Sequence, residues 1–493
     1  MTVTVVSPAV GVEATTDPRH PLVRLGQLFD PGTMSVFRPA DEAGVAVATG
    51  RIAGARAVAY CTDASRMGGA LGACGARNIV EAIHLALHRG CPVVGLWHSG
   101  GAKLADGIES MDGVGQMFAA MIRASGRVPQ LSVVLGPAAG AAAYGPALTD
   151  LVILSATNGR LFVTGPDVVR RVTGEQVDME TLGGAGTHSW SSGVAHVIAD
   201  SEADAYQRAR RFTALLAHPG VVDPTAVAEP RDLRALLPET ARRAYDVRPL
   251  VRAIVDRDFE ESQPRWARNI VTGLGRLGGR AIGVIANNPL HKGGCLDSLS
   301  AEKASRFVRM CDSFGVPLLV IVDVPGYLPG VGQESGGVVR RGAKLLHAFG
   351  EAVVPRVTLI TRKSYGGAYI AMNSRSLGAS AVLAWPDAEV AVMGAQAAVE
   401  VLHRRALAAA SDEERPALLA RLVAAHEVEA GGLDRGLSLG VVDEIIEPAD
   451  TRRRVAEAIA AAAPPPGQHG DNPVGGAGDP PPAPGRRTDP RRG

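Results

Sequence analysis

The sequence predicts an α/β protein made of two related domains, because one order of strands, loops and helices occurs twice. Pro92 precedes an apolar strand, and the next strand of the same copy follows Pro129, 37 residues later. Pro317 and Pro355 occupy the matching places in the second copy, 38 residues apart. The copies are separated by 225 residues, much farther than the repeats of a solenoid, so we interpret them as a duplicated domain.

Four short, mainly apolar segments form the strands of this repeat. They are Val93–Leu96 and Leu131–Leu135 in the first copy, and Leu318–Val322 and Val357–Ile360 in the second. Such segments are typical of parallel strands that helices cover on both faces. We therefore expect two α/β domains of about 220 residues each.

Three stripes of apolar residues with helical spacing accompany these strands, and we expect each stripe to face a core. The first stripe contains Leu104, Ile108, Met111, Val114, Met117, Phe118 and Met121. The second contains Ala304, Phe307, Val308, Cys311 and Phe314, and the third contains Val338, Gly342, Leu345, Leu346 and Phe349.

The chain divides into three parts by composition. Residues 1–240 and 241–462 each hold one copy, and the Pro- and Arg-rich stretch 219–249 is the predicted connection between them. Residues 463–493 are rich in Pro, Gly and Arg and lack an apolar pattern. We expect this last part to be a disordered tail.

The composition excludes several classes of protein. Lys and Arg total 51 against 50 for Asp and Glu, so no global charge attracts nucleic acid or an anionic membrane. The apolar run Val316–Val322 is too short to cross a bilayer, and residues 1–11 do not resemble a signal peptide. The five cysteines include no C-x-x-C pair, and the twelve histidines show no metal-ligand spacing. We expect a cytoplasmic protein without a metal site or disulfides.

A turn of small residues follows the last strand of each copy. The first turn lies within Gly136–Tyr144 and the second within Tyr365–Tyr369, and Gly140 and Gly366 are each 11 residues after the preceding proline. Small side chains let a ligand approach the backbone, where the free N–H groups of a helix start can stabilise an oxyanion. Tight packing of a strand against a helix would require the same residues, but their occurrence in both copies favours two ligand sites.

Other chemistries have less support from the residues. Gly337–Gly342 has the spacing of a phosphate-binding loop but lacks the lysine directly after its last glycine, and no G-x-S-x-G motif occurs. His98 is either a polar group in the site or a structural histidine. Three cations near the first-copy loops, Arg66, Arg77 and Lys103, either meet phosphates or lie solvated on the surface.

Eight longer motifs occur in order between about residues 20 and 460. They are Trp97–Lys103, Tyr144–Asp150, Phe162–Pro166, Gly294–Asp297, Val322–Gly330, Arg340–Lys344, Arg362–Tyr369 and Ala384–Pro386. Together they resemble the carboxyltransferase β subunit of biotin-dependent acyl-CoA carboxylases, in particular the actinobacterial acetyl-CoA and propionyl-CoA carboxylase type.

The resemblance implies two crotonase-like (ClpP/crotonase) domains that move a carboxyl group to the α-carbon of acetyl-CoA or propionyl-CoA. Acyl-CoA would bind the N-terminal domain of one copy. Carboxybiotin, carried by a biotinylated α subunit, would bind the C-terminal domain of a second copy, so that active sites lie at dimer interfaces within a homohexamer.

The resemblance also assigns the site. Gly140 with Ala141 match the N–H pair for the thioester enolate, and Gly367 with Ala368 match the pair for the biotin ureido oxygen. Ile370 would border the acyl group and favour short unbranched chains. The residues expected to bind substrate are Ser99, Gly100, Gly101, Tyr144, Ile370, Arg66, Arg77 and Lys103.

Three residues depart from the common pattern of this family: His98 replaces Asp, Lys103 replaces Arg, and Ala141 replaces a second Gly. The N–H group at position 141 is retained, so only the space above it shrinks. No Met-Lys-Met biotinylation motif occurs in the sequence, and we therefore expect dependence on a biotinylated partner. No side-chain acid or base is required, because the biotin ureido nitrogen can accept the α-proton.

Two other functions stay open at this point. A malonyl-CoA or methylmalonyl-CoA decarboxylase, or a transcarboxylase component, could use the same fold. A non-catalytic assembly subunit could retain the dimer surface, although the intact turns in both copies argue against it.

Overall fold

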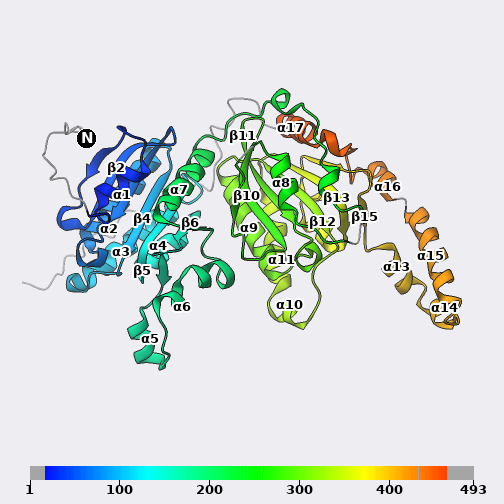
Figure 1. Ribbon diagram of the computed structural model, residues 1–493, viewed down its shortest axis with the longest axis horizontal. Coiled ribbons are helices and arrows are strands. Elements are labelled where there is room, and N and C mark those ends of the chain that lie inside the picture. Colours follow the sequence, from blue (N-terminus) through cyan, green and yellow to red (C-terminus); the bar gives the residue numbers. More distant parts are fainter. Residues whose placement is uncertain (1–16, 241–242, 257, 431, 463–493) are drawn as a thin grey trace, which may run out of the picture.

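The computed structural model describes residues 17–240, 243–256, 258–430 and 432–462. Within these residues the chain forms two eight-stranded sheets that lie side by side (Figure 1). This confirms the predicted α/β class with two domains. The expected tail, 463–493, lies outside the described residues.

The first sheet has the order β1-β2-β3-β4-β5-β6-β8, with β7 paired to the end of β5. Helices α2 and α3 cover one face, and α1 and α7 pack on the other. The strands are β1 (Ser35–Arg38), β2 (Val45–Ile52), β3 (Ala55–Thr62), β4 (Val93–Ser99), β5 (Gln130–Ala139), β6 (Leu151–Ser155), β7 (Arg160–Phe162) and β8 (Val197–Ala199). The helices are α1 (Pro21–Leu28), α2 (Ala73–Arg89), α3 (Gly107–Ala124), α4 (Ala141–Leu148), α5 (Pro166–Thr173), α6 (Met179–Gly183) and α7 (Glu202–Ala217).

The second sheet has the order β9-β10-β11-β12-β13-β14-β16, with β15 paired to the end of β13. Helices α9 and α11 cover one face, and α8 and α17 pack on the other. The strands are β9 (Glu260–Ser262), β10 (Ile270–Leu277), β11 (Arg280–Asn287), β12 (Leu318–Val324), β13 (Arg356–Tyr365), β14 (Ala381–Ala384), β15 (Glu389–Ala391) and β16 (Glu444–Ile445). The helices are α8 (Arg248–Ile254), α9 (Ser298–Ser313), α10 (Val331–Ser335), α11 (Val338–Glu351), α12 (Gly366–Ala371), α13 (Ala395–Leu402), α14 (Arg404–Ala409), α15 (Arg415–Ala430), α16 (Gly432–Ser438) and α17 (Thr451–Ala462).

The two sheets share one topology, as the repeat predicts. Strands β5 and β13 each contain ten residues, and each pairs with a short strand at its carboxyl end. The register between the two central strands also shifts at matching places, between Trp97 and Ser99 and between Val322 and Val324. The bulge residues, His98 and Asp323, are therefore equivalent positions of the two copies.

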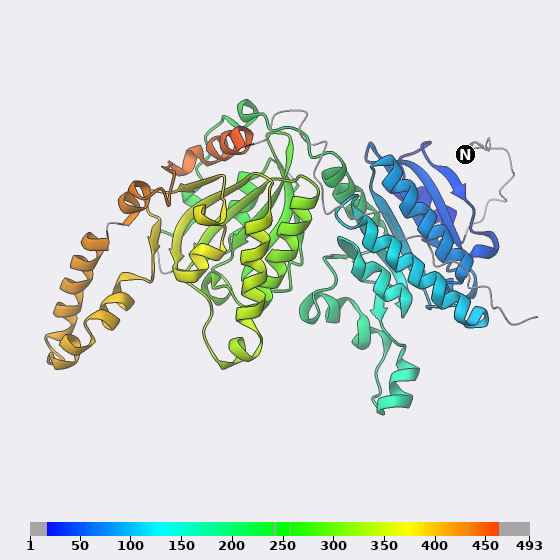
Figure 2. The ribbon, with the colours of Figure 1, turned by 180° about the vertical axis from the view of Figure 1, so that it is seen from behind.

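Helix α7 joins the two domains. It contacts β6 of the first sheet and β10 of the second, and one continuous hydrophobic core extends from the α1 and α7 layer into the α9 and α11 layer. Figure 2 shows α2 and α3 (blue to cyan) and α9 and α11 (yellow-green) on the same side of the molecule. The two copies thus face the same way, so their turns after β5 and β13 lie at corresponding ends of the sheets.

The first predicted helical stripe is wrong in its first half. Val114, Met117 and Met121 are buried, but Leu104 is 93% exposed and Ile108 is 82% exposed. Leu104 and Ile108 lie at the start of the segment, before α3 has reached the sheet that covers its later turns. The second and third stripes do face the core, with Leu346 at the margin.

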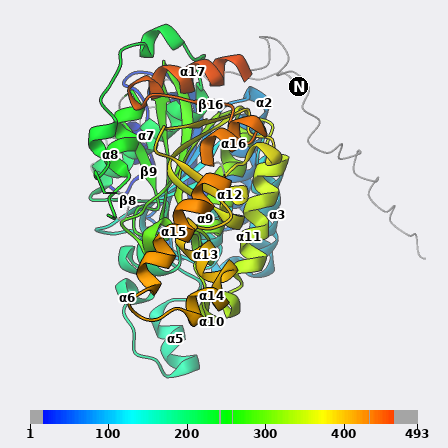
Figure 3. The same ribbon diagram turned by 90° about the vertical axis from the view of Figure 1, so that its right-hand side faces the viewer.

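Two groups of helices project from the sheets. Helices α5 and α6 follow β7 of the first sheet, and α13 to α16 form a longer arm beyond β15 of the second (Figures 1 and 3). The arm exposes the apolar side chains of Val401, Leu402, Val428 and Leu439. No residue of α15 is buried, so the chain itself provides little cover for the arm.

A left-handed turn precedes α2 and recurs before α9. Gly69 has φ +74°, and a Cβ atom there would lie 2.0 Å from the carbonyl oxygen of His98. Gly294 has φ +79°, and a Cβ atom there would lie 2.6 Å from the carbonyl oxygen of Asp323. Both glycines therefore let the turn approach the bulge in the central strand.

Gly69→Ala should destabilise the protein more than Gly68→Ala. Both residues have positive φ, which costs an alanine on the order of 1–2 kcal/mol. Only at Gly69 would the new Cβ also meet a backbone atom, because no atom lies within 4 Å of the Cβ position of Gly68. Urea unfolding of both variants measures the difference, and equal losses would show that the close approach does not matter.

Candidate active site

The first turn connects β5 to α4 through Gly140. Gly140 has φ +56°, and its N–H group donates to the carbonyl of Phe162 at 3.1 Å. The carbonyl of Gly140 in turn accepts from the N–H group of Ala143 at 2.9 Å. The N–H groups of Ala141 and Ala142 have no acceptor among the described residues. The turn therefore presents two adjacent free donors at the start of α4.

The second turn repeats this geometry between β13 and α12. Because β15 pairs with β13 as β7 pairs with β5, Gly366 takes the place of Gly140. Its φ is +59°, close to that of its counterpart. The next two N–H groups, of Gly367 and Ala368, have no acceptor within the described part of the chain. A Cβ atom at Gly367 would meet nothing within 4 Å, so the space above it is open.

The two donor pairs expected from the sequence are not at equivalent positions. Gly367 and Ala368 correspond to Ala141 and Ala142, whereas the expected first pair was Gly140 with Ala141. The physical reason is the pairing of β7, since the carbonyl of Phe162 engages the N–H group of Gly140. Gly140 makes the turn, and Ala142 replaces it as a free donor.

The loop after β4 supports the first turn. The N–H group of Gly100 donates to the carbonyl of Gly68 at 2.9 Å, and the N–H group of Gly101 donates to Oγ of Ser99 at 3.3 Å. A Cβ atom on Gly101 would lie 3.1 Å from the carbonyl oxygen of Ala139. Ser99 is fully buried, so these predicted substrate-binding residues hold the loop against the end of β5.

A cavity of about 1020 Å³ lies beside this loop. Arg66 and Lys103 line it as predicted cations, and Lys103 pairs with Asp106 at 3.0 Å. Arg77 does not line the cavity and is exposed on α2. The lining residues are Asp41, Glu42, Ala43, Gly44, Arg66, Met67, Ala70, Gly72, Cys74, Gly75, Lys103 and Asp106. The cavity is large enough for part of an extended, phosphate-bearing ligand.

Comparison with known proteins identifies this arrangement. The model of the carboxyl transferase domain matches residues 17–467. The chain belongs to the carboxyl transferase family. The resemblance noted in the sequence is thereby confirmed.

Individual relatives agree with the family of this carboxyltransferase. It is 59% identical over 475 residues to the biotin-dependent acetyl-/propionyl-coenzyme A carboxylase beta6 subunit of Mycobacterium tuberculosis, which covers 96% of this chain and 100% of the relative. It is 61% identical over 438 residues to the propionyl-CoA carboxylase beta chain of Rhodococcus erythropolis, covering 88% and 92%. The solved hexamer assembly of transcarboxylase 12S, with methylmalonyl-coenzyme A bound, matches with a TM-score of 0.84 at 39% identity and 91% coverage of both chains. The crotonase-like fold is confirmed.

Two predicted substrate-binding residues of the carboxyltransferase stand at equivalent positions. Tyr144 lies four residues after Gly140, and Ile370 lies four residues after Gly366. Both are partly exposed, at 52% and 44%, on the helices that begin at the two turns. Each turn of free N–H groups thus has one large side chain beside it.

Sequence reasoning missed two contacts that fix the second turn. The hydroxyl of Tyr365 donates to the carboxylate of Glu389, which ties the end of β13 to β15. Arg362 pairs with buried Asp323 at 3.1 Å, and Asp323 also accepts from the N–H group of Lys363. Burial raises the pKa of Asp323, although Arg362 opposes this shift. The D-x-P-G sequence after β12 contained Asp323, but its partner on β13 required the sheet register.

His98 occupies the position of Asp323 in the first copy. Its ring packs on Gly136, where a Cβ atom would lie 2.3 Å from Nδ1. Burial, and then the nearby guanidinium of Arg24, lower the pKa of His98 to about 4. The ring is therefore neutral at pH 7 and forms part of the support below the turn.

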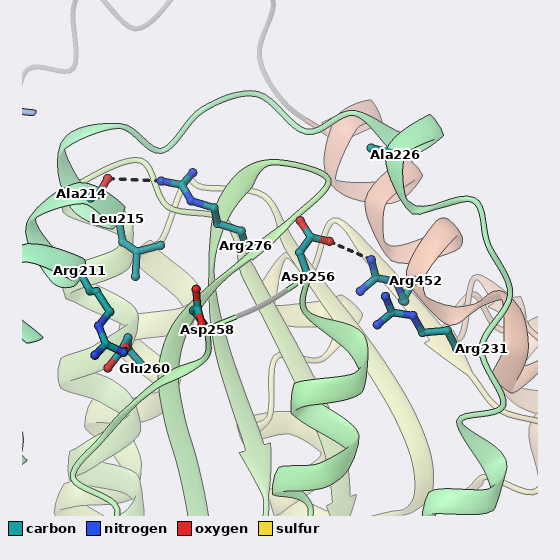
Figure 4. Close-up of a pocket in the computed structure, with 10 residues that line it drawn as sticks. All are labelled: Arg211, Ala214, Leu215, Ala226, Arg231, Asp256, Asp258, Glu260, Arg276 and Arg452. Atoms are coloured by element: carbon teal, nitrogen blue, oxygen red, sulfur yellow. Dashed lines mark hydrogen bonds and ion pairs between the residues drawn. The ribbon is translucent and has the colours of Figure 1, made fainter. Parts of the chain in front are cut away.

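A further cavity, of about 510 Å³, lies where α7, β10 and α17 meet (Figure 4). It is at the far end of the second sheet from the turn, because β10 ends at the hairpin that starts β11. Arg452 pairs with Asp256 at 2.8 Å, and Arg211 pairs with Glu260 at 2.7 Å. These ion pairs join elements of both domains, and we assign no ligand to the cavity.

Three further searches of the described residues bear on the predicted classes. They contain no group of three or more His, Cys, Asp or Glu side chains placed to hold a metal ion. No helix in the same ranges is long and apolar enough to cross a membrane. Cys61, Cys91 and Cys311 are buried free thiols, and Cys74 is an exposed one.

Gly367→Pro and Gly367→Ala separate the N–H donor from the small side chain. Proline removes the N–H group and is tolerated in the first turn of a helix, whereas alanine keeps the N–H group and has open space. We expect Gly367→Pro to lose on the order of 10²–10³ in kcat, the cost of one oxyanion donor. Gly367→Ala should stay within a few fold of the parent. Steady-state kinetics with thermal melts as a folding control measure this, and full activity of a folded Gly367→Pro variant would contradict the donor role.

Proposed function

We propose that the chain is the carboxyltransferase β subunit of an acyl-CoA carboxylase, which moves a carboxyl group from carboxybiotin to the α-carbon of acetyl-CoA or propionyl-CoA. The products are malonyl-CoA and methylmalonyl-CoA. The observation that carries this proposal is the pair of equivalent turns, each with two adjacent free N–H groups. The family match and the names of the relatives support the same reaction.

The chemistry requires two oxyanion sites. Carboxybiotin supplies the carboxyl group, and the ureido nitrogen left behind can accept the α-proton. In this reaction the N–H groups of Ala141 and Ala142 would stabilise negative charge on the thioester oxygen, and those of Gly367 and Ala368 the charge on the ureido oxygen. Backbone donors fixed in advance lower the barrier because they need no reorganisation. The open space above Gly367 fits a ring that must approach the backbone.

We propose that the active site forms between two copies of the chain. The two turns belong to separate sheets that lie side by side. Exposed apolar residues at the first turn, among them Met67, Leu104 and Ile108, and the uncovered arm α13 to α16 provide surface for a second copy. A hexamer of such dimers is consistent with the hexamer assembly of transcarboxylase 12S.

The donor of the carboxyl group is proposed to be a biotinylated α subunit. The sequence contains no Met-Lys-Met motif, and the relatives are named as subunits of biotin-dependent carboxylases. We propose a cytoplasmic location, because the reaction uses acyl-CoA and ATP.

The test is fixation of labelled bicarbonate into acetyl-CoA and propionyl-CoA, with ATP and a biotinylated α subunit. Label in malonyl-CoA or methylmalonyl-CoA, dependent on both chains, is the expected result. Transfer from methylmalonyl-CoA to another acceptor without bicarbonate fixation would indicate a transcarboxylase component instead. Acyl-CoA binding without any transfer would contradict the enzymatic proposal.

Arg66→Met and Lys103→Met should weaken acyl-CoA binding. Both cations line the cavity beside the first turn, where CoA carries phosphates, and a charge-assisted contact is worth about tenfold in affinity. We expect KM to rise by this factor for acetyl-CoA and propionyl-CoA alike, with kcat unchanged. Arg77→Met is the matched control, since Arg77 lies outside the cavity. An equal effect of all three substitutions would contradict the placement of CoA.

Ile370→Asp should change the choice between substrates. Ile370 stands beside the second turn with an exposed apolar side chain, and each methylene of the acyl chain is worth about 1–3 kcal/mol in an apolar site. We expect the ratio of kcat/KM for propionyl-CoA and acetyl-CoA to shift by about tenfold. Ile370→Val, which stays apolar, should leave the ratio nearly unchanged. If both substrates lose equally in Ile370→Asp, the residue has only a packing role.

A further inference from the structure

We propose that a second cavity, at the seam between the two domains, binds a small oxyanion such as phosphate or a short carboxylate. The cavity has a volume of about 190 Å³, which is smaller than a cofactor site but sufficient for an ion of this size. It is lined by Ser189, Ala195, His196, Val197, Ile198, Asp200, Arg208, Arg252, Phe259, Glu261, Gln263, Pro264 and Arg265. The first part of this set belongs to the first domain and the rest to the second.

His196 provides a buried donor in this cavity. It is 5% exposed, and its Nδ1 atom accepts the N–H group of Val152 at 3.1 Å. The neutral ring therefore carries its proton on Nε2, which has no partner among the described residues. Burial lowers the pKa of His196 well below its ordinary value, so the ring stays neutral. A neutral N–H donor that is fixed by the backbone fits an oxygen acceptor.

Two cations of the lining lack a carboxylate partner. Neither Arg252 nor Arg265 forms an ion pair within the described residues, and the guanidinium of Arg265 lies 6.0 Å from the ring centre of Trp190. These groups are in place for an anion, because a guanidinium binds carboxylate and phosphate oxygens in a planar fork.

The remaining charges of the lining largely have partners elsewhere. Arg208 pairs with Glu260 at 2.8 Å, and Glu261 pairs with Arg248 at 2.8 Å. Asp200 is the lining carboxylate without an ion pair among the described residues, so the balance of unpaired charge is positive.

A buried lysine strengthens the positive potential behind the cavity wall. Nζ of Lys303 donates to the carbonyls of Gln263, Trp266 and Ile270 at 2.9 to 3.0 Å. This contact fixes the segment that carries Arg265, and the N–H group of Gln263 donates to the carbonyl of His196. An anion held by His196 and Arg265 would therefore link the two domains where their backbones already meet.

Binding of inorganic phosphate to the full-length protein tests this site. Calorimetry and thermal melts at constant ionic strength should show saturable binding with one site per chain and a rise in Tm with phosphate concentration. Arg252→Ala and Arg265→Ala should each weaken the phosphate Kd about tenfold, and His196→Asn should do so by removing the Nε2 donor. Arg268→Ala is the matched control, because Arg268 also stacks on Trp190 at 5.6 Å but does not line the cavity. It should leave Kd within twofold.

Titration with malonate distinguishes a carboxylate ligand from phosphate within the same site. Binding without saturation, or equal weakening by Arg265→Ala and Arg268→Ala, would overturn the proposal. Competition by CoA that is lost in Arg265→Ala would assign the cavity to the substrate and would overturn it as well. The proposal is independent of the carboxyltransferase reaction, because Arg252→Ala and Arg265→Ala should retain bicarbonate fixation in phosphate-free buffer.

Discussion

The structure depends on one constraint of the backbone: a helix that begins directly at the end of a buried strand leaves N–H groups without partners. In both copies a glycine with φ near +60° turns the chain, and the next two N–H groups stay free. The surrounding contacts keep this arrangement in place. The short strands β7 and β15 extend the sheet past the turn, and the loop after β4 presses on the end of β5. The reaction needs these unsatisfied donors, and the fold supplies them twice.

Duplication conserved the donors and let their surroundings diverge. The bulge position carries neutral His98 in one copy and the Asp323 ion pair in the other. The residue four positions after the turning glycine is Tyr144 in one and Ile370 in the other. The first copy also has a large cavity with two cations beside its turn. These differences match two ligands that share the need for an oxyanion site but differ in charge and size.

Much of this architecture could be predicted from local sequence. The spacing of prolines, apolar segments and glycines predicted the repeat, the α/β class and the location of both turns. The register of the first donor pair could not be predicted, because it depends on a bond between Gly140 and Phe162 that joins β5 to β7. Leu104 and Ile108 have the spacing of core residues and yet are exposed, since periodicity reports a face and not what covers it. Arg77 and Arg66 look alike in the sequence, and only the path of α2 places one of them outside the cavity.

The central claim is that one active site combines the first turn of one chain with the second turn of another. Hybrid oligomers test it most directly: Ala141→Pro chains, which lack a first-turn donor, are mixed with Gly367→Pro chains, which lack a second-turn donor. Each parent should be nearly inactive. After dissociation and reassembly, the mixture should recover about a quarter of the parental activity, because half of the random dimers contain one intact site of two. If the mixture stays as inactive as its components although hybrids form, both turns of a site belong to one chain and the account is wrong.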